Sequence, residues 1–189
     1  GPWQAHARGA ELVVNTAAVV SNTAPRELYW RISVNGVRKV LDAAVAAGAR
    51  RFVQISSCAA FGKQFPPDVE ETYPVAAATG RNYDDAKGGS EHPALAAHAA
   101  GDIACTIIRP GDVYGPGSRP WVLIPLQTIA TSSAFLLPAH GKGILSPIYI
   151  DDLVDGIVLA AGSSAAAAPA ARRTPWRAQP SSHPPPCWP

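Results

Sequence analysis

The sequence contains no apolar stretch that approaches the roughly 18 uncharged residues typical of a membrane-spanning helix. No basic segment followed by an apolar run opens it, so nothing indicates a secretory signal. The 16 lysine and arginine residues are balanced by 14 aspartate and glutamate residues, which leaves a net charge of +2. This balance argues against a strong attraction to nucleic acid or to an anionic membrane. We therefore expect a cytoplasmic protein with neither kind of partner.

Cysteine and histidine are too few and too scattered to indicate a disulfide framework or a metal site. The three cysteines, Cys58, Cys105 and Cys187, are far apart and odd in number. None of the five histidines belongs to a His-Glu-x-x-His pair. We therefore expect buried or incidental thiols in a reducing compartment and no bound metal.

The 189 residues are enough for one domain with a core of its own. Between residues 11 and 161, short β-rich runs alternate with longer stretches of helical periodicity. This pattern predicts strands over residues 11–17, 51–56, 103–108 and 144–150, and helices over residues 25–47, 83–100, 121–130 and 151–161. Strands separated by helices of this length form βαβ units with parallel strands. The predicted fold class is α/β, a Rossmann-like parallel sheet with flanking helices.

The two ends of the chain do not share this pattern. Residues 1–10 show no periodicity, and residues 163–189 are rich in Ala, Pro and Arg. A segment of such composition buries too little apolar surface to offset the entropy lost on ordering. We therefore divide the chain into an irregular start at 1–10, one domain at 11–162 and a disordered tail at 163–189. A proline-rich docking peptide is the alternative for the tail.

Tyr83 and Lys87 are four residues apart on a predicted helix. Four residues make just over one helical turn, so both side chains project from the same face. An ammonium group beside a phenol favours the phenolate, so we expect Lys87 to lower the pKa of Tyr83 from its usual value of about 10. Tyr83 would then act as a general acid or base on a hydroxyl or carbonyl group. Taken alone, the pair is equally typical of an ordinary exposed helix surface.

Two serines, Ser56 and Ser57, stand at the end of the strand predicted over residues 51–56. Open parallel sheets bind their ligands at the carboxyl ends of their strands. A hydroxyl group in this place can donate a hydrogen bond to the substrate oxygen that Tyr83 protonates. The alternative is that the serines only cap the end of the strand.

Four motifs, taken in order, resemble the extended short-chain dehydrogenase/reductase family, which includes NAD-dependent epimerases and dehydratases and 3β-hydroxysteroid dehydrogenases. They are Ser-Ser-x-x-x-Phe-Gly at 56–62, Tyr-x-x-x-Lys at 83–87 with Glu91 beyond it, Ile-Arg-Pro-Gly-Asp-Val-Tyr-Gly-Pro-Gly at 108–117 and Tyr-Ile-Asp-Asp-Leu at 149–153. The resemblance covers the chain from about Glu11 to Ala161. Its specificity comes from four linked motifs rather than from any one of them.

The resemblance implies an NAD(P)-dependent oxidoreductase or epimerase acting on a small alcohol, a sterol-like compound or a sugar nucleotide. It implies that Ser57 polarises the substrate oxygen, that Tyr83 is the acid/base and that Lys87 binds the nicotinamide ribose. The segments at 114–117 and around Ser146 would border the substrate, and a homodimer is an expected assembly. The cofactor, NAD or NADP, would contact Thr16, Ala17, Ala18, Ser56, Tyr83, Lys87, Pro110 and Val113.

Two departures from the family pattern weaken these expectations. Ser33 stands where the family has an asparagine, and Asn35 lies on a different face of the helix, so a backbone bond or proton relay through that amide is in doubt. The helix after Lys87 carries Gly88, Gly89 and Pro93. Interior glycines cost about 1 kcal/mol each and an interior proline about 3 kcal/mol, so we expect the helix to break there.

The largest departure is the absence of the family's opening strand, Gly-x-x-Gly-x-x-Gly turn and helix, which hold the cofactor pyrophosphate. We therefore expect an incomplete chain that binds NAD(P) weakly or not at all. The strand at 11–17 should be an exposed apolar edge. A non-catalytic binding or regulatory module on the same fold, and a truncated or frame-shifted product without function, are the alternatives.

Overall fold

The computed structural model describes residues 6–21, 23–62, 65–66, 69–131, 145–162 and 173–175. A four-stranded parallel sheet forms its centre, in the order β1-β2-β3-β6. The strands are β1 (Leu12–Asn15), β2 (Arg51–Ile55), β3 (Ala104–Arg109) and β6 (Arg173–Pro175). The parallel sheet and its flanking helices confirm the predicted α/β fold class. β6 was not expected, because its residues lie in the tail predicted to be disordered; the rest of that tail and residues 1–5 lie outside the described residues.

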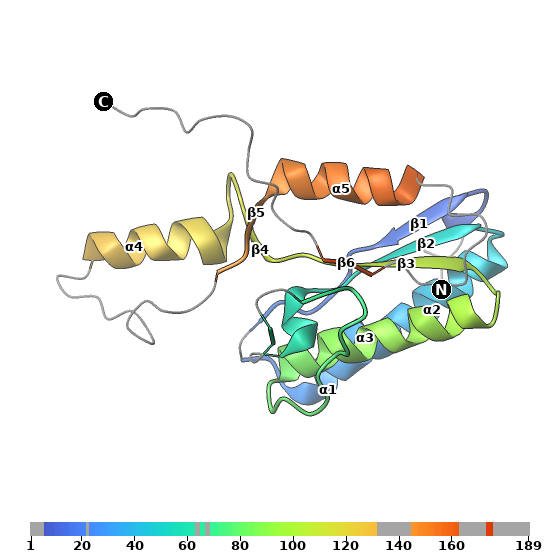
Figure 1. Cartoon of the computed structure of the whole chain (residues 1–189), viewed down its shortest axis with the longest axis horizontal. Helices are drawn as coiled ribbons and strands as arrows, with labels where there is room; N and C mark the ends of the chain where they lie inside the picture. Colours follow the sequence, from blue (N-terminus) through green and yellow to red (C-terminus); the bar gives the residue numbers. More distant parts are fainter. Residues whose placement is uncertain are drawn as a thin grey trace.

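The two faces of the sheet are covered by different helices (Figure 1). One face carries α1 (Arg26–Tyr29), a π-helical turn η2 (Trp30–Val34), α2 (Asn35–Ala46) and α3 (Asn82–Ala99), and the other carries α5 (Ile150–Gly162). Successive strand residues alternate between the two cores because side chains of a strand point to opposite faces. Phe52 and Ile107 pack with α2 and α3, whereas Val53 and Ile108 pack with α5.

The helix predicted over residues 25–47 is confirmed, with one modification. The π-helical turn η2 separates α1 from α2. On the predicted apolar face, Val37, Leu41 and Ala44 are buried, whereas Val45 is exposed. Gly48 follows the helix with a φ of +79°, a conformation that favours glycine and ends the helix as expected.

The break expected in the helix after Lys87 is wrong, because α3 is continuous through Pro93. Gly88 and Gly89 are used for close packing: a Cβ atom on Gly89 would lie 3.3 Å from a methyl group of Val34, and one on Gly88 would lie 3.4 Å from the carbonyl oxygen of Ala76. Beyond the proline, Ala94 is fully buried against the sheet. Tertiary packing therefore outweighs the low helix propensity of this segment.

A second, smaller pair of parallel strands lies beside the main sheet. It consists of β4 (Asp112–Tyr114) and β5 (Pro147–Tyr149), and β4 was missed because three residues carry no readable periodicity. The π-helical turn η4 (Arg119–Leu123) and α4 (Ile124–Thr131) follow β4 and project away from the body of the molecule (Figure 1). The strand predicted at 144–150 and the helices predicted at 121–130 and 151–161 are confirmed with shifted ends, residue 144 lying outside the described residues.

β1 forms one edge of the main sheet in the described part of the chain, as the sequence predicts. Its Val14 points to the α5 side of the sheet but remains 39% exposed, because α5 lies over β2 and β3. The exposed strand edge with an uncovered valine is a surface open to pairing with another chain.

No helix long and apolar enough to cross a membrane is found among the described residues.

We expect Val14→Lys to reduce self-association of the chain, because a lysine on an edge strand opposes pairing with a further strand. The free energy of unfolding should change by no more than about 0.5 kcal/mol, since the side chain is already substantially exposed. Sedimentation velocity over a range of protein concentrations measures the association. Identical concentration dependence in the two proteins would show that β1 is not the associating edge.

Candidate active site

The carboxyl end of β2 and the first turns of α3 bring Ser57, Tyr83 and Lys87 together. Ser57 leaves β2 in an extended conformation and caps the 3-10 helix η3 (Cys58–Phe61), where its hydroxyl accepts a hydrogen bond of 3.2 Å from the amide of Ala59. The side chain of Ser57 also lies close enough to the Tyr83 phenol to lower its pKa. The Lys87 Nζ atom lies 5.8 Å from the centre of the Tyr83 ring. Ser57 therefore combines the capping role with a direct contact to the predicted acid/base.

The expected lowering of the Tyr83 pKa is wrong for the chain by itself. Burial raises the pKa of the Tyr83 phenol above its usual value, and the neighbouring Ser57 side chain offsets this only in part. Nearby Cys58, Asp84 and Tyr29 raise it further. The ammonium group of Lys87 does not offset the burial. Tyr83 is therefore a protonated phenol at neutral pH and can donate its proton before it accepts one.

Lys87 is the buried cation of the site, with 6% of its surface exposed. Its Nζ donates a hydrogen bond of 3.2 Å to the carbonyl oxygen of Ile55, the last residue of β2. Burial lowers the pKa of Lys87 to about 8, while the carboxylate of Glu91 acts in the opposite direction. An ammonium group has three donors, and Ile55 takes one of them.

The ring of Tyr29 packs against the ring of Tyr83, a contact that the sequence did not reveal. The two rings meet edge to face, with centroids 6.4 Å apart and an interplanar angle of 75°. Tyr29 is 2% exposed, and its hydroxyl donates a hydrogen bond to the carbonyl oxygen of Ser21. Nothing in the residue pattern could have identified this contact, because Tyr29 and Tyr83 lie on different helices.

The residues expected to contact the cofactor fall into two groups. Thr16 and Ala17 are exposed and Ala18 is half-buried just beyond the carboxyl end of β1, where they are accessible to a ligand. Pro110 is buried, and its carbonyl oxygen accepts a hydrogen bond of 2.9 Å from the amide of Cys58. Val113 is half-buried and packs with the core under α5.

Ser56 differs from the other expected cofactor residues because its hydroxyl points into the protein interior. It is 3% exposed and donates a hydrogen bond of 2.7 Å to Glu91. Its amide donates one of 2.7 Å to the carbonyl oxygen of Ile108. The predicted contact of Ser56 with a cofactor is therefore not made by this hydroxyl, whose place is in the core beneath Ser57.

Ser33 makes the backbone bond that the sequence put in doubt. Its side chain is buried, and its hydroxyl accepts a hydrogen bond of 2.9 Å from the amide of Val19 in the loop after β1. Asn35 is exposed on another face of the helix, as predicted. A hydroxyl group thus anchors the loop that carries Thr16, Ala17 and Ala18.

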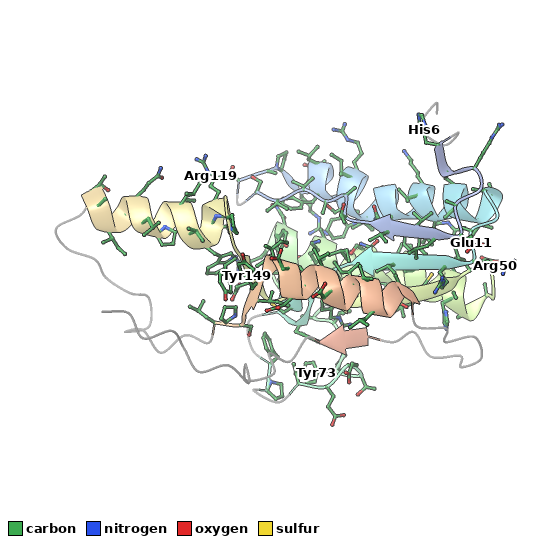
Figure 2. The ribbon with its side chains drawn as sticks, turned by 90° about the horizontal axis from the view of Figure 1, so that it is seen from above. His6, Glu11, Arg50, Tyr73, Arg119 and Tyr149 are labelled. Atoms are coloured by element: carbon green, nitrogen blue, oxygen red, sulfur yellow. The ribbon has the colours of Figure 1, made fainter. Side chains whose placement is uncertain are left out.

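The candidate site lies at the carboxyl ends of the parallel strands. Figure 2 shows Glu11 and Arg50 at the amino ends of β1 and β2, and Tyr149 at the opposite end, where β5 meets α5. Tyr149 and Tyr114 form a tilted aromatic pair with centroids 5.4 Å apart. A serine, a tyrosine and a lysine thus meet at the end of a Rossmann-like parallel sheet where open α/β folds bind their ligands.

Comparison with known proteins identifies the family. The family model of the NAD dependent epimerase/dehydratase family matches residues 4–171, and the chain belongs to this family. It is 24% identical over 155 residues to the 3beta-hydroxysteroid-dehydrogenase/decarboxylase isoform 1 of Arabidopsis thaliana, covering 81% of this chain and 35% of that protein. It is 28% identical over 154 residues to a dTDP-glucose 4,6-dehydratase of Streptomyces griseus, covering 79% of this chain and 46% of that protein.

Solved structures show the same fold. The dTDP-glucose 4,6-dehydratase of Streptomyces venezuelae, with NAD and TYD bound, superimposes with a TM-score of 0.74 at 27% identity and covers 86% of this chain and 52% of that one. The UDP-glucuronic acid 4-epimerase of Bacillus cereus, with UDP-glucuronic acid and NAD bound, gives a TM-score of 0.70 at 21% identity, with coverages of 82% and 50%. The chain therefore spans about half the length of these solved relatives.

The low pKa of Lys87 predicts a specific pH dependence of stability. The folded chain releases the Lys87 proton from a pKa of about 8, whereas the unfolded chain retains it up to 10.5. The unfolded state thus binds more protons between these values, so the contribution of Lys87 to the free energy of unfolding rises with pH, by about 3 kcal/mol at most. Urea titrations of the wild type and Lys87→Met measure it.

The difference between wild type and Lys87→Met isolates Lys87 from Tyr83, whose raised pKa favours unfolding above pH 10 in both proteins. We expect the wild type to gain stability relative to the variant as the pH rises from about 8 to 10.5. Parallel profiles for the two proteins over this range would show that the folded state does not depress the pKa of Lys87.

Proposed function

We propose that this chain carries the acid–base residues of an NAD-dependent oxidoreductase or epimerase acting on a hydroxyl or carbonyl group of a small molecule. The observation that supports this most directly is the meeting of Ser57, Tyr83 and Lys87 at the carboxyl end of β2. The substrate is a sugar nucleotide, a sterol-like compound or another small alcohol. The names of the relatives include enzymes of both the sugar-nucleotide and the sterol kind.

Each of the three residues has a distinct task in this proposal. Tyr83 gives its phenolic proton to a substrate carbonyl, or takes a proton from a substrate hydroxyl, so that charge does not build up on that oxygen. The Ser57 hydroxyl lies next to Tyr83 and orients the same substrate oxygen. Lys87 has donors left beyond its bond to Ile55, and these would hold a ribose hydroxyl of the cofactor. The nicotinamide, when bound, supplies hydride transfer at the substrate carbon.

The described residues fit the nicotinamide end of such a cofactor. Lys87 is buried with an incompletely used ammonium group, and Thr16 and Ala17 are exposed beyond the end of β1. The glycine-rich turn that binds a pyrophosphate is not found in the sequence. These residues would therefore hold and orient the reactive nicotinamide end of the cofactor, while the phosphate anchor, which supplies much of the binding energy, is not among them.

We expect this chain alone to bind NAD or NADP weakly or not at all, because it has no glycine-rich turn at a helix N-terminus to neutralise the pyrophosphate. Isothermal titration of the purified chain with each dinucleotide measures the affinity. A dissociation constant in the micromolar range or below would contradict the expectation. It would also show that the strand-end contacts alone are sufficient for binding.

We expect Tyr83→Phe to lower kcat by about a hundredfold or more while leaving cofactor affinity unchanged, because it removes only the proton that Tyr83 transfers. The measurement uses the chain fused to a glycine-rich strand-turn-helix unit, with turnover followed by nicotinamide absorbance. Tyr73→Phe is the matched control, because Tyr73 packs on Phe61 outside the three-residue cluster. Wild-type turnover in Tyr83→Phe would refute the assignment.

A further inference from the structure

A bidentate ion pair lies in the interior directly beneath the candidate site. Arg109 and Glu91 are both almost completely buried, with 1% and 0% of their surfaces exposed. The Nε atom of Arg109 donates to one carboxylate oxygen of Glu91 at 2.8 Å, and its second guanidinium nitrogen donates to the other at 2.7 Å. Two parallel hydrogen bonds of this kind fix the orientation of both groups as well as their distance.

Ser56 connects this pair to the end of β2. Its hydroxyl donates a hydrogen bond of 2.7 Å to the same oxygen of Glu91 that accepts from Arg109 Nε. Ser56 is directly followed by Ser57, so the bond holds the chain at the point where Ser57 leaves the strand. Because these polar groups are buried, the loss of any one hydrogen-bond partner would lower the free energy of unfolding.

The ion pair is also connected to α3, which carries Lys87, and to η3, which Ser57 caps. Glu91 lies one helical turn after Lys87 on α3, so its position also sets the position of that turn. The guanidinium group of Arg109 lies 4.4 Å from the centre of the Phe61 ring, at the end of the helix that Ser57 caps. One ion pair thus joins β2, β3, α3 and η3 in one place.

We infer that Ser56, Glu91 and Arg109 are positioning residues that hold Ser57 at the end of β2, next to Tyr83. This inference rests on the proposed function for its catalytic meaning, but the contact itself is a property of the chain. A buried ion pair is weak evidence for a contribution to stability, because the cost of desolvating the two charges offsets their attraction. A role in geometry accounts for the bidentate bonding and for the third partner, Ser56, adjacent to Ser57.

The titration of Tyr83 reports on this geometry without any need for turnover. The neighbouring Ser57 side chain lowers the pKa of Tyr83, so we expect its displacement to raise that pKa. Tyrosine labelled with ¹³C at the ring carbon that bears the hydroxyl gives one NMR signal for each of the five tyrosines, and Tyr83→Phe assigns the signal of interest. Ser57→Ala gives the pKa shift of Tyr83 that is expected when the contact with Ser57 is removed completely.

We expect Ser56→Ala to raise the pKa of Tyr83 in the same direction as Ser57→Ala and by a comparable amount, although the Tyr83–Ser57 contact is not itself substituted. Ser90→Ala is the matched control, because Ser90 is an equally buried serine whose hydroxyl bonds within its own helix, to the carbonyl oxygen of Lys87. An unchanged titration in Ser56→Ala overturns the inference, and so does a Ser57→Ala variant that leaves Tyr83 unmoved.

Glu91→Gln tests the carboxylate itself, with Asp42→Asn as its control, because Asp42 pairs with Arg38 on an exposed helix surface and loses the same charge. Glu91→Gln should raise the pKa of Tyr83, and Asp42→Asn should leave it at the wild-type value. Glu91→Gln leaves Arg109 buried without a charged partner, and circular dichroism shows whether the variant folds. If it does not fold, the result with Ser56→Ala decides.

The outcomes separate this inference from the proposed function. In the fused protein described above, Ser56→Ala should lower kcat and leave KM unchanged. Wild-type turnover in Tyr83→Phe refutes the proposed function, while the NMR titration still decides whether Ser56 holds Ser57. Conversely, an unmoved titration in Ser56→Ala together with a turnover that depends on Tyr83 refutes the positioning role alone.

Discussion

β2 and β3 run side by side with Phe52 opposite Cys105 and Ile55 opposite Ile108. This register divides their side chains between the two cores, and a shift by one residue would turn every apolar side chain to the wrong face. It also determines which groups emerge at the carboxyl ends of the strands. Ser56 leaves β2 beside the end of β3, where Arg109 stands, and Glu91 of α3 bonds to both. The pairing of these two buried strands therefore determines the geometry of the candidate site.

The sequence predicted the elements that carry strong periodicity and the residues that belong to short linear motifs. The proximity of Ser57, Tyr83 and Lys87 could be predicted, because each belongs to a motif defined by its neighbours in the chain, and their catalytic roles stay a prediction. The contacts of Tyr29 with Tyr83 and of Glu91 with Arg109 could not, because they join residues on separate elements. The pKa of Tyr83 was predicted in the wrong direction, since a motif shows the neighbouring charge but not the extent of burial.

The helix α3 shows why local rules failed where packing is dense. Gly88 and Gly89 disfavour a helix in isolation, yet here they allow Val34 and Ala76 to approach the helix axis closely. The same closeness buries Lys87 and Glu91 on that helix. The two glycines lower the helix propensity of this segment, but they allow the close packing that buries these charged groups. Hydrogen bonds of buried groups are stronger than those in water.

The separation of paired residues along the chain has a kinetic consequence. Leu12 pairs with Arg51 and Arg51 with Ala104, so neither contact forms until a long stretch of chain has closed on itself. Sheets built from such distant pairings fold slowly, because loop closure costs entropy before any contact compensates for it. Until then Leu12, Val13 and Val14 are an apolar segment without a fixed neighbour. Another chain can therefore also capture this segment during folding, before β1 has paired with β2.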